Sequence, residues 1–166
     1  MQTARASRTI AAPFEDVWRI VSDPYHLPRW WPRVERVEDV ADGAFTEVMR
    51  TKAGKTVRAD FDLLRTDEGA GTVVWEQRLA GTPFAGVLSH SQTELHVAGG
   101  TGSGGSEVTI EMRQELSGRA VEPGPIGSGV PKLPRRRTPS LGGWMLRRAA
   151  GRIIKEALDG LEQISA

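Results

Sequence analysis

Three groups of residues in this 166-residue chain could take part in catalysis or ligand binding. The first is a set of two histidines and a glutamate. His90, Glu94 and His96 fall within one predicted strand, Val87–Val97. At a rise of about 3.3 Å per residue, the two histidines lie roughly 20 Å apart, too far to share a metal ion. We therefore expect no metal site and place all three side chains on a solvated face. If this strand turned its other face inward, His90 would become the acid/base candidate.

The second group is a pair of carboxylates. Asp60 and Asp62 share one face of the predicted strand Thr56–Leu64, opposite an apolar face that includes Phe61. Paired carboxylates perform acid/base chemistry only in a sheltered site, where burial shifts their pKa. Because the apolar face is the one expected to point inward, we predict that both aspartates are solvated and lie near Arg58.

The third group is a glycine run, Gly100–Gly105, which fits the pattern G-x-G-x-x-G. In a dinucleotide site this pattern opens a helix, whose N-terminus faces the pyrophosphate. Here a strand follows from Glu107, so we predict a hairpin loop. The sequence contains no G-x-S-x-G, Walker A or H-E-x-x-H motif, although a dispersed Ser/His/Asp triad stays open.

The composition excludes several classes of protein. Cysteine is absent, which removes disulfide scaffolds, thiol nucleophiles and Cys-ligated metals. The 22 basic and 21 acidic side chains nearly cancel, which argues against nucleic-acid binding. No apolar run approaches the ~20 residues of a membrane span, and Met1–Ala12 lacks the apolar core of a signal peptide. We expect a cytoplasmic location and no cofactor.

The spacing of apolar residues predicts the helices and strands that would position a site. Apolar spacing and Pro13 predict a short helix after a first strand, Thr3–Ile10, with a second helical segment, Tyr25–Trp31. Period-two patterns predict six more strands: Val34–Val40, Ala44–Thr51, Thr56–Leu64, Thr72–Leu79, Val87–Val97 and Glu107–Leu116. A 3.6-residue period predicts a long helix, Leu141–Ile164. We interpret residues 1–166 as one domain with a Pro/Gly/Arg-rich insertion at 118–140.

Three segments near the start carry a resemblance to a known family: APFEDVW (12–18), VSDP (21–24) and LPRWWP (27–32). They resemble the opening of the START-like helix-grip superfamily, which includes polyketide cyclase/dehydrase and lipid-transfer-like domains. The later strands and the terminal helix fit this resemblance, whereas the insertion departs from it. The resemblance implies an α+β helix-grip fold, with a curved antiparallel sheet of about seven strands around the long C-terminal helix. Two short helices would follow the first strand.

The predicted inner faces of the strands favour a cavity. They are apolar with a few neutral polar side chains, among them Gln77, Ser91 and Gln114. Buried polar groups need partners, which a ligand or water can provide. If these three side chains faced solvent, the cavity prediction would be wrong. The residues that we predict to line the cavity are Trp31, Phe61, Trp75, Gln77, Ser89, Ser91, Thr93, Met112, Gln114, Leu146, Ala150 and Ile153.

Basic and apolar side chains gather at the start of the long helix. Arg135–Arg137 with Arg147, Arg148, Arg152 and Lys155 form a basic cluster, which is either a solvated face or a site for an acidic partner, a phosphate or an anionic membrane. Leu141, Trp144 and Met145 fall on the polar side of the helix and need a cover. We propose the segment 118–140 as a lid, or a second subunit in a homodimer.

The sequence therefore predicts a protein that binds a hydrophobic or aromatic small molecule, lipid-like or polyketide-like, in an internal cavity. The resemblance leaves a cyclase/dehydrase-like enzyme open, with His90 as its candidate proton carrier. One alternative is a non-catalytic carrier or sensor, and another is a regulatory interaction module that uses Trp144 and the basic cluster. A sheltered ionisable group in the cavity would favour the enzyme, an all-apolar cavity the carrier, and a filled core the interaction module.

Overall fold

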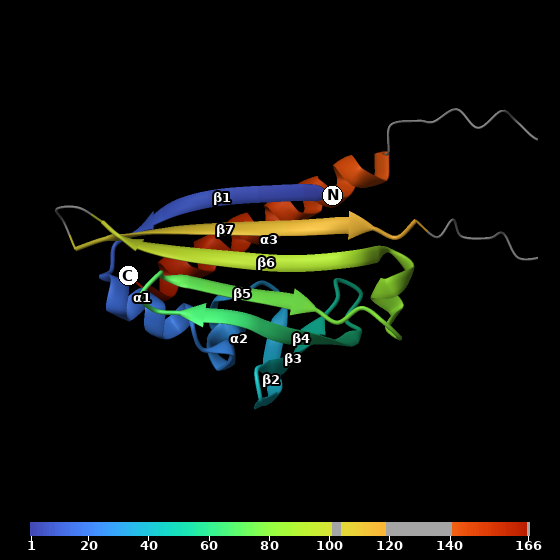
Figure 1. Ribbon diagram of the computed structural model, residues 1–166, viewed down its shortest axis with the longest axis horizontal. Coiled ribbons are helices and arrows are strands. Elements are labelled where there is room, and N and C mark those ends of the chain that lie inside the picture. Colours follow the sequence, from blue (N-terminus) through green and yellow to red (C-terminus); the bar gives the residue numbers. More distant parts are fainter. Residues whose placement is uncertain (101–103, 119–140, 166) are drawn as a thin grey trace, which may run out of the picture.

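The computed structural model describes residues 1–100, 104–118 and 141–165, and its centre is one antiparallel sheet of seven strands (Figure 1). The strand order is β1-β7-β6-β5-β4-β3-β2, so β1 joins the sheet beside the last strand. The strands are β1 (Gln2–Ile10), β2 (Val34–Ala41), β3 (Ala44–Arg50), β4 (Thr56–Asp67), β5 (Thr72–Gln77), β6 (Leu88–Gly99) and β7 (Ser106–Leu116). Each predicted strand is present.

Short helices connect β1 to β2. Helix α1 (Phe14–Val21) begins after Pro13 and carries Glu15 and Asp16 in its first turn, where the helix dipole favours negative charge. The 3-10 helix η1 (Pro24–His26) follows, and its cap Asp23 accepts a 3.0 Å hydrogen bond from the backbone N–H of Tyr25. Helix α2 (Leu27–Trp30) completes the connection. A further 3-10 helix, η2 (Pro83–Gly86), precedes β6 and was not predicted.

The long helix α3 (Leu141–Ser165) packs on one face of the sheet, behind the strands in Figure 1. Its buried stripe is Ala150, Ile154, Ala157, Leu158 and Leu161, which meets apolar side chains from the strands and from α1 and α2. Register shifts interrupt the pairing between β2 and β3, between β4 and β5, and between β6 and β7. Bulges of this kind bend and twist a sheet. The result is a curved sheet around one helix, which confirms the predicted helix-grip fold.

The C-terminal half of α3 is fixed tightly against its neighbours. A Cβ atom added at Gly160 would lie 2.4 Å from the carbonyl oxygen of Trp30, so only glycine permits this approach of α3 to α2. Arg8 on β1 donates to Asp159 and Glu162 at 2.5 and 2.9 Å. This end of the space between helix and sheet is therefore closed by close packing and ion pairs.

None of the helices in the described part of the chain is long and apolar enough to cross a lipid bilayer. The predicted insertion lies, from residue 119 onward, outside the described residues, and so do Arg135–Arg137 and the proposed lid. The assignment of the whole chain to one domain therefore stays a prediction.

Candidate ligand-binding cavity

A cavity of about 200 Å³ lies between the inner face of the sheet and α3. Its walls are mainly apolar, with two amides, two hydroxyls and one carboxyl among them. The lining residues are Trp31, Glu47, Met49, Phe61, Trp75, Gln77, Phe84, Leu88, Ser91, Thr93, Met112, Gln114 and Ile153. A dry cavity of about 150 Å³ is enough to hold benzene, so this space suits a ring-sized apolar group.

Two adjacent strands supply most of the neutral polar groups. Ser91 and Thr93 on β6 and Gln114 on β7 are buried, because alternate residues of each strand point to the same face. The side-chain amide of Gln114 donates to the hydroxyl of Ser91 at 3.3 Å. Gln77 on β5 lines the same cavity and is partly buried. None of the three residues chosen as the test of the cavity prediction faces bulk solvent.

Aromatic rings line the cavity beside these polar groups, since Trp75 pairs with Thr93 and Phe61 with Gln77 in the sheet. Trp31 follows α2 directly and meets Trp75 of β5 edge to face, with ring centroids 5.6 Å apart. Phe61 on β4 lies parallel to Phe45 on β3 at 5.2 Å. Such rings are rigid and offer large apolar contact areas. Their contacts with one another help to fix the shape of the cavity.

Among the described residues that line the cavity, Glu47 on β3 is the one with an ionisable side chain, and it is only 2% exposed. The strand register places Val37 and Ala59 beside it, and Phe45 and Met49 precede and follow it on the same face. Its carboxyl makes no hydrogen bond or ion pair with any described residue, and Oε1 is completely buried without a partner. Burial raises the pKa of Glu47 from 4.5 to about 8, so the carboxyl carries its proton at neutral pH.

The cavity adjoins two hollows at the surface. One, of about 170 Å³, shares Met49 and Phe84 with the cavity and adds Val57 and Arg33. The other, of about 340 Å³, shares Ile153 and is lined by Arg33, Lys52, Ala149, Arg152 and Glu156. The mouth therefore lies beside the middle of α3, and its described lining includes the cations Arg33, Arg50, Lys52 and Arg152 and the carboxylate of Glu156.

The structure brings nine of the twelve predicted lining residues to the cavity: Trp31, Phe61, Trp75, Gln77, Ser91, Thr93, Met112, Gln114 and Ile153. The other three lie elsewhere. Ser89 is exposed, Leu146 is half-buried on the first turns of α3, and Ala150 is buried in the core away from the cavity. Whether any of these residues contacts a ligand stays a prediction.

The placement of Ser89 is wrong because β6 is irregular at its start. Strict alternation from Thr93 put Val87, Ser89 and Ser91 on one face, but the pairing with β7 shifts register between Leu88 and His90. Leu88 therefore lines the cavity, whereas Val87 and Ser89 are exposed. Beyond the shift the predicted face is correct, since Ser91, Thr93, Leu95 and Val97 are buried.

The histidines and aspartates lie on the outer face, as predicted. His90 lies outside the cavity, with Nδ1 3.8 Å from a carboxylate oxygen of Glu76. The partners of the aspartates differ from the expectation, because Arg58 contacts Glu38 and Asp39 instead. Asp60 accepts a 2.5 Å hydrogen bond from Thr46, and Asp62 is paired with Arg78, whose hydrogen bond lowers the pKa of that carboxyl.

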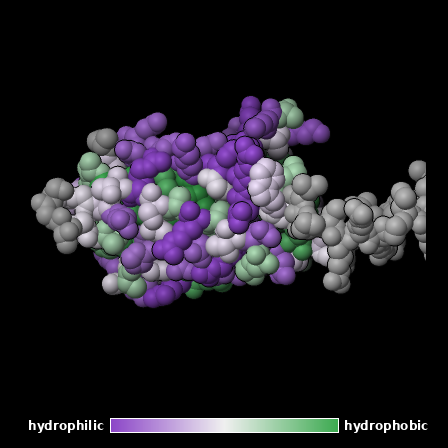
Figure 2. Space-filling view, turned by 90° about the horizontal axis from the view of Figure 1, so that it is seen from above, coloured by the Kyte–Doolittle hydropathy of each residue, from purple (hydrophilic) through white to green (hydrophobic). Residues whose placement is uncertain are grey.

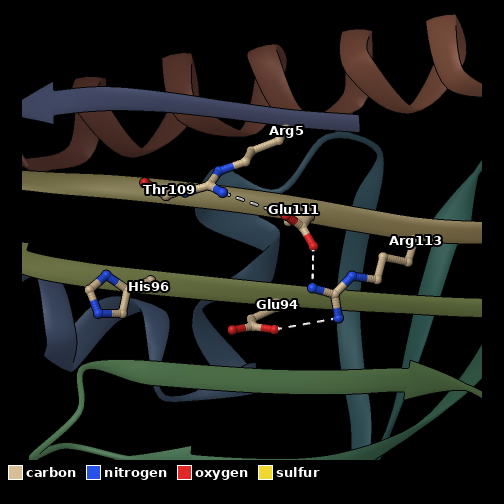
Figure 3. A pocket seen from close by; sticks show the side chains of 6 residues that line it. All are labelled: Arg5, Glu94, His96, Thr109, Glu111 and Arg113. Atoms are coloured by element: carbon tan, nitrogen blue, oxygen red, sulfur yellow. Dashed lines mark ion pairs between the residues drawn. The ribbon is translucent and has the colours of Figure 1, made fainter. Parts of the chain in front are cut away.

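A second hollow, of about 220 Å³, lies on the outer face, and Figure 3 shows its six side chains over β1, β6 and β7. They are Arg5, Glu94, His96, Thr109, Glu111 and Arg113. Arg5 lies 3.9 Å from Glu111, Arg113 lies 3.9 Å from Glu94, and Arg113 also contacts Glu111. No three acidic or histidine side chains of the described residues gather in a way that could hold a metal ion.

The start of α3 exposes two large apolar side chains. Trp144 and Met145 are 51% and 61% exposed, and the guanidinium of Arg148 lies 5.2 Å from the centre of the Trp144 ring. The face in Figure 2 is mainly hydrophilic, with hydrophobic residues in a small central area and at scattered places near its edges. Apart from Arg148, no described residue is recorded against the Trp144 ring, and a cover by a lid or a partner subunit stays a prediction.

Comparison with known proteins agrees with this geometry. The model of the family described as "Polyketide cyclase / dehydrase and lipid transport" matches residues 1–165. No curated protein matches the sequence.

Several solved structures share the fold at low sequence identity. A START superfamily protein from Mycobacterium smegmatis is 12% identical, with a TM-score of 0.69, and the match covers 99% of this chain and 97% of that one. The Zhui aromatase/cyclase from Streptomyces sp. R1128 is 16% identical, with a TM-score of 0.69 and coverage of 99% and 93%. The di-domain aromatase/cyclase BexL is 18% identical, with a TM-score of 0.73, and the match covers 98% of this chain and 46% of BexL.

Proposed function

Because the chain belongs to the polyketide cyclase/dehydrase and lipid transport family, we propose that it binds a hydrophobic or aromatic small molecule in the cavity beneath α3. The observation that carries this proposal is the cavity itself, which is lined by aromatic rings and a few neutral polar groups. Small-molecule sites typically combine a mostly apolar lining with a few well-placed polar groups. The cavity alone is smaller than the ~300–1,000 Å³ of typical ligand sites, so a longer ligand would extend through the mouth.

Two versions of this function differ in whether a reaction follows binding. Glu47 supports the cyclase/dehydrase-like version, because it is a sheltered ionisable group whose raised pKa suits proton transfer near neutral pH. Catalysis would then combine this group with the folding of a reactive chain in a shaped space. A non-catalytic carrier or sensor would need only the apolar walls. A filled core would have favoured the regulatory interaction module, whereas the space beneath α3 is hollow.

Fluorescence titration with N-phenyl-1-naphthylamine, a neutral apolar dye, tests binding in the cavity. We expect saturable binding of one dye per chain, accompanied by a change in tryptophan emission, because Trp31 and Trp75 line the space. Thr93→Leu adds bulk inside the cavity and should weaken binding at least about tenfold, a cost of about 1.4 kcal/mol. Thr109→Leu is the matched control, because Thr109 lines the outer hollow and should leave the affinity unchanged.

Two results would refute the proposal. One is the absence of saturable binding by a folded protein, and the other is equal weakening by the inner and the outer leucine. Native mass spectrometry of the purified protein adds an independent test, since a bound cellular ligand would appear as a mass that Thr93→Leu removes.

A further inference from the structure

Glu47 stands out because its surroundings give its carboxyl nothing to bind. The side chain is 2% exposed, and its four nearest neighbours along and across the strands are Val37, Phe45, Met49 and Ala59. Most buried polar groups in proteins have hydrogen-bond partners, and an unpartnered one costs roughly 1–3 kcal/mol. A carboxyl that has no protein partner but borders a cavity is therefore placed to find its partner in whatever occupies the cavity.

No charged side chain of the described residues around the cavity is paired with Glu47. None of the other described lining residues is titratable, whether it comes from β4, β5, β6, β7, α2 or α3. The charged side chains that line the two adjoining surface hollows are Arg33, Arg50, Lys52, Arg152 and Glu156. None of these five forms an ion pair or hydrogen bond with Glu47 in the described structure, and Arg50 is paired with Glu35. Burial thus keeps the carboxyl neutral, and its O–H has no acceptor among the described residues.

We propose that Glu47, in its protonated form, donates a hydrogen bond to a carbonyl oxygen of the ligand, so that the cavity selects neutral ketone-bearing apolar molecules. This inference rests on the proposed function, because it concerns the same cavity. A ketone oxygen accepts hydrogen bonds and carries no charge, so it can follow an apolar ring into a dry space at small cost. The amides of Gln77 and Gln114 and the hydroxyl of Thr93 are then available to other oxygens of the same molecule.

An amine ligand would use Glu47 in the opposite way. It would require the ionised carboxylate as a counter-ion, and both charges would have to leave water. The cavity offers little to offset that cost, because its other described polar groups are neutral amides and hydroxyls. The structure therefore favours binding of a ketone over binding of an ammonium group. A matched set of probes can distinguish these two modes of binding.

The test compares three probes of nearly the same shape: 2-acetylnaphthalene, 2-isopropenylnaphthalene and 1-(2-naphthyl)ethylamine. The isopropenyl compound replaces the carbonyl oxygen by a methylene group, and the amine replaces the carbonyl by an ammonium-bearing carbon. At pH 6 we expect the ketone to bind about five- to tenfold more tightly than the alkene, as one net hydrogen bond predicts. At pH 9.5 the preference for the ketone should disappear, because a carboxylate has no proton to donate.

Two variants show whether Glu47 is the donor. Glu47→Gln keeps an N–H donor and should retain a preference for the ketone that no longer depends on pH. Glu47→Met has a similar length but no donor, and it should bind ketone and alkene equally at both pH values. Both variants remove a buried ionisable group, so neither is expected to unfold the protein.

The outcomes separate this inference from the proposed function. If neither ketone nor alkene binds at any pH, the proposed function fails and the role of Glu47 fails with it. If both bind but the ketone has no advantage at pH 6, or keeps its advantage in Glu47→Met, the role of Glu47 alone is refuted. Tighter binding of the amine than of the ketone would also overturn it, in favour of a counter-ion.

Discussion

The sheet carries a hollow on each face, and β6 and β7 line both of them. The outer hollow of about 220 Å³ and the inner cavity of about 200 Å³ differ little in size. They differ in how their charges are satisfied. On the outer face Arg5, Glu111, Arg113 and Glu94 form a chain of ion pairs (Figure 3). On the inner face Glu47 has no partner among the described residues.

This difference matters more than volume for assigning a site. Partly exposed ion pairs across strands satisfy one another and contribute little energy, so the outer hollow needs no ligand to account for its residues. A buried carboxyl without a partner lowers stability and has no structural benefit on the inner face. The comparison therefore supports the proposal that ligands bind in the inner cavity, and three predictions test how the two faces differ.

The largest expected effect is on the pH dependence of stability. The folded-state pKa of Glu47 is about 8 and its ordinary value is 4.5, so between these values the folded protein holds a proton that the unfolded chain has lost. The free energy of unfolding therefore falls as pH rises through this window. Glu47→Gln should remove this loss of stability with rising pH. It should raise the free energy of unfolding by on the order of 3–5 kcal/mol at pH 9, and by little at pH 4.5.

Urea denaturation of wild type and variant at the two pH values measures this gain. Glu111→Gln is the matched control from the outer hollow and should show no comparable pH-dependent gain. A gain in Glu47→Gln that is the same at both pH values would mean that the Glu47 carboxyl is not neutral in the folded protein.

A smaller effect is expected from two glycines of α3, which lie at the closed and the open end of the inner face. Gly160→Ala forces a Cβ against the carbonyl of Trp30, and overpacking of this kind costs about 1–3 kcal/mol. A Cβ atom added at Gly151 has no neighbour within 4 Å. Gly151→Ala should therefore raise the free energy of unfolding by about 0.5–1 kcal/mol, because alanine has the higher helix propensity. Thermal unfolding of both variants measures the difference, and equal effects would contradict the asymmetry between the two ends.

The smallest effect is expected on the outer face. Arg113→Ala removes two contacts of the ion-pair chain, yet its side chain is 43% exposed. We expect a loss below about 1 kcal/mol, and the loss should shrink as salt is added. Denaturation at low and high salt measures it. A loss of several kcal/mol would show that the outer charges stabilise the fold much more than their exposure implies.

The sequence predicts the fold well because its periodicities are strong. Alternation along β7 correctly places Val108, Ile110 and Met112 inside, and the spacing in α3 correctly identifies a buried face. Irregular positions are where pattern reasoning fails. The register shift at the start of β6 exposes Ser89, and the residue types in that segment do not predict the shift. Leu146 and Ala150 lie on the predicted helix face, but which turn of a helix borders a cavity depends on tertiary packing.

Glu47 is the functional candidate that sequence reasoning missed, although a signal was present. Phe45, Glu47 and Met49 alternate along β3, so a carboxyl stands between two large apolar side chains on one face. Alternation alone predicts that such a residue points inward with its neighbours. Its isolation could not be predicted, because Val37 and Ala59 come from other strands whose register only the structure shows.

The most direct test of the inner site is an NMR titration of the Glu47 side-chain carboxyl in protein labelled with ¹³C-glutamate, with Glu47→Gln used for assignment. The raised pKa predicts a midpoint near 8, and 2-acetylnaphthalene should move it higher, because the ligand binds the protonated form. A midpoint near 4.5, unchanged by the ketone, would contradict the account, since Glu47 would then be an ordinary solvated carboxylate.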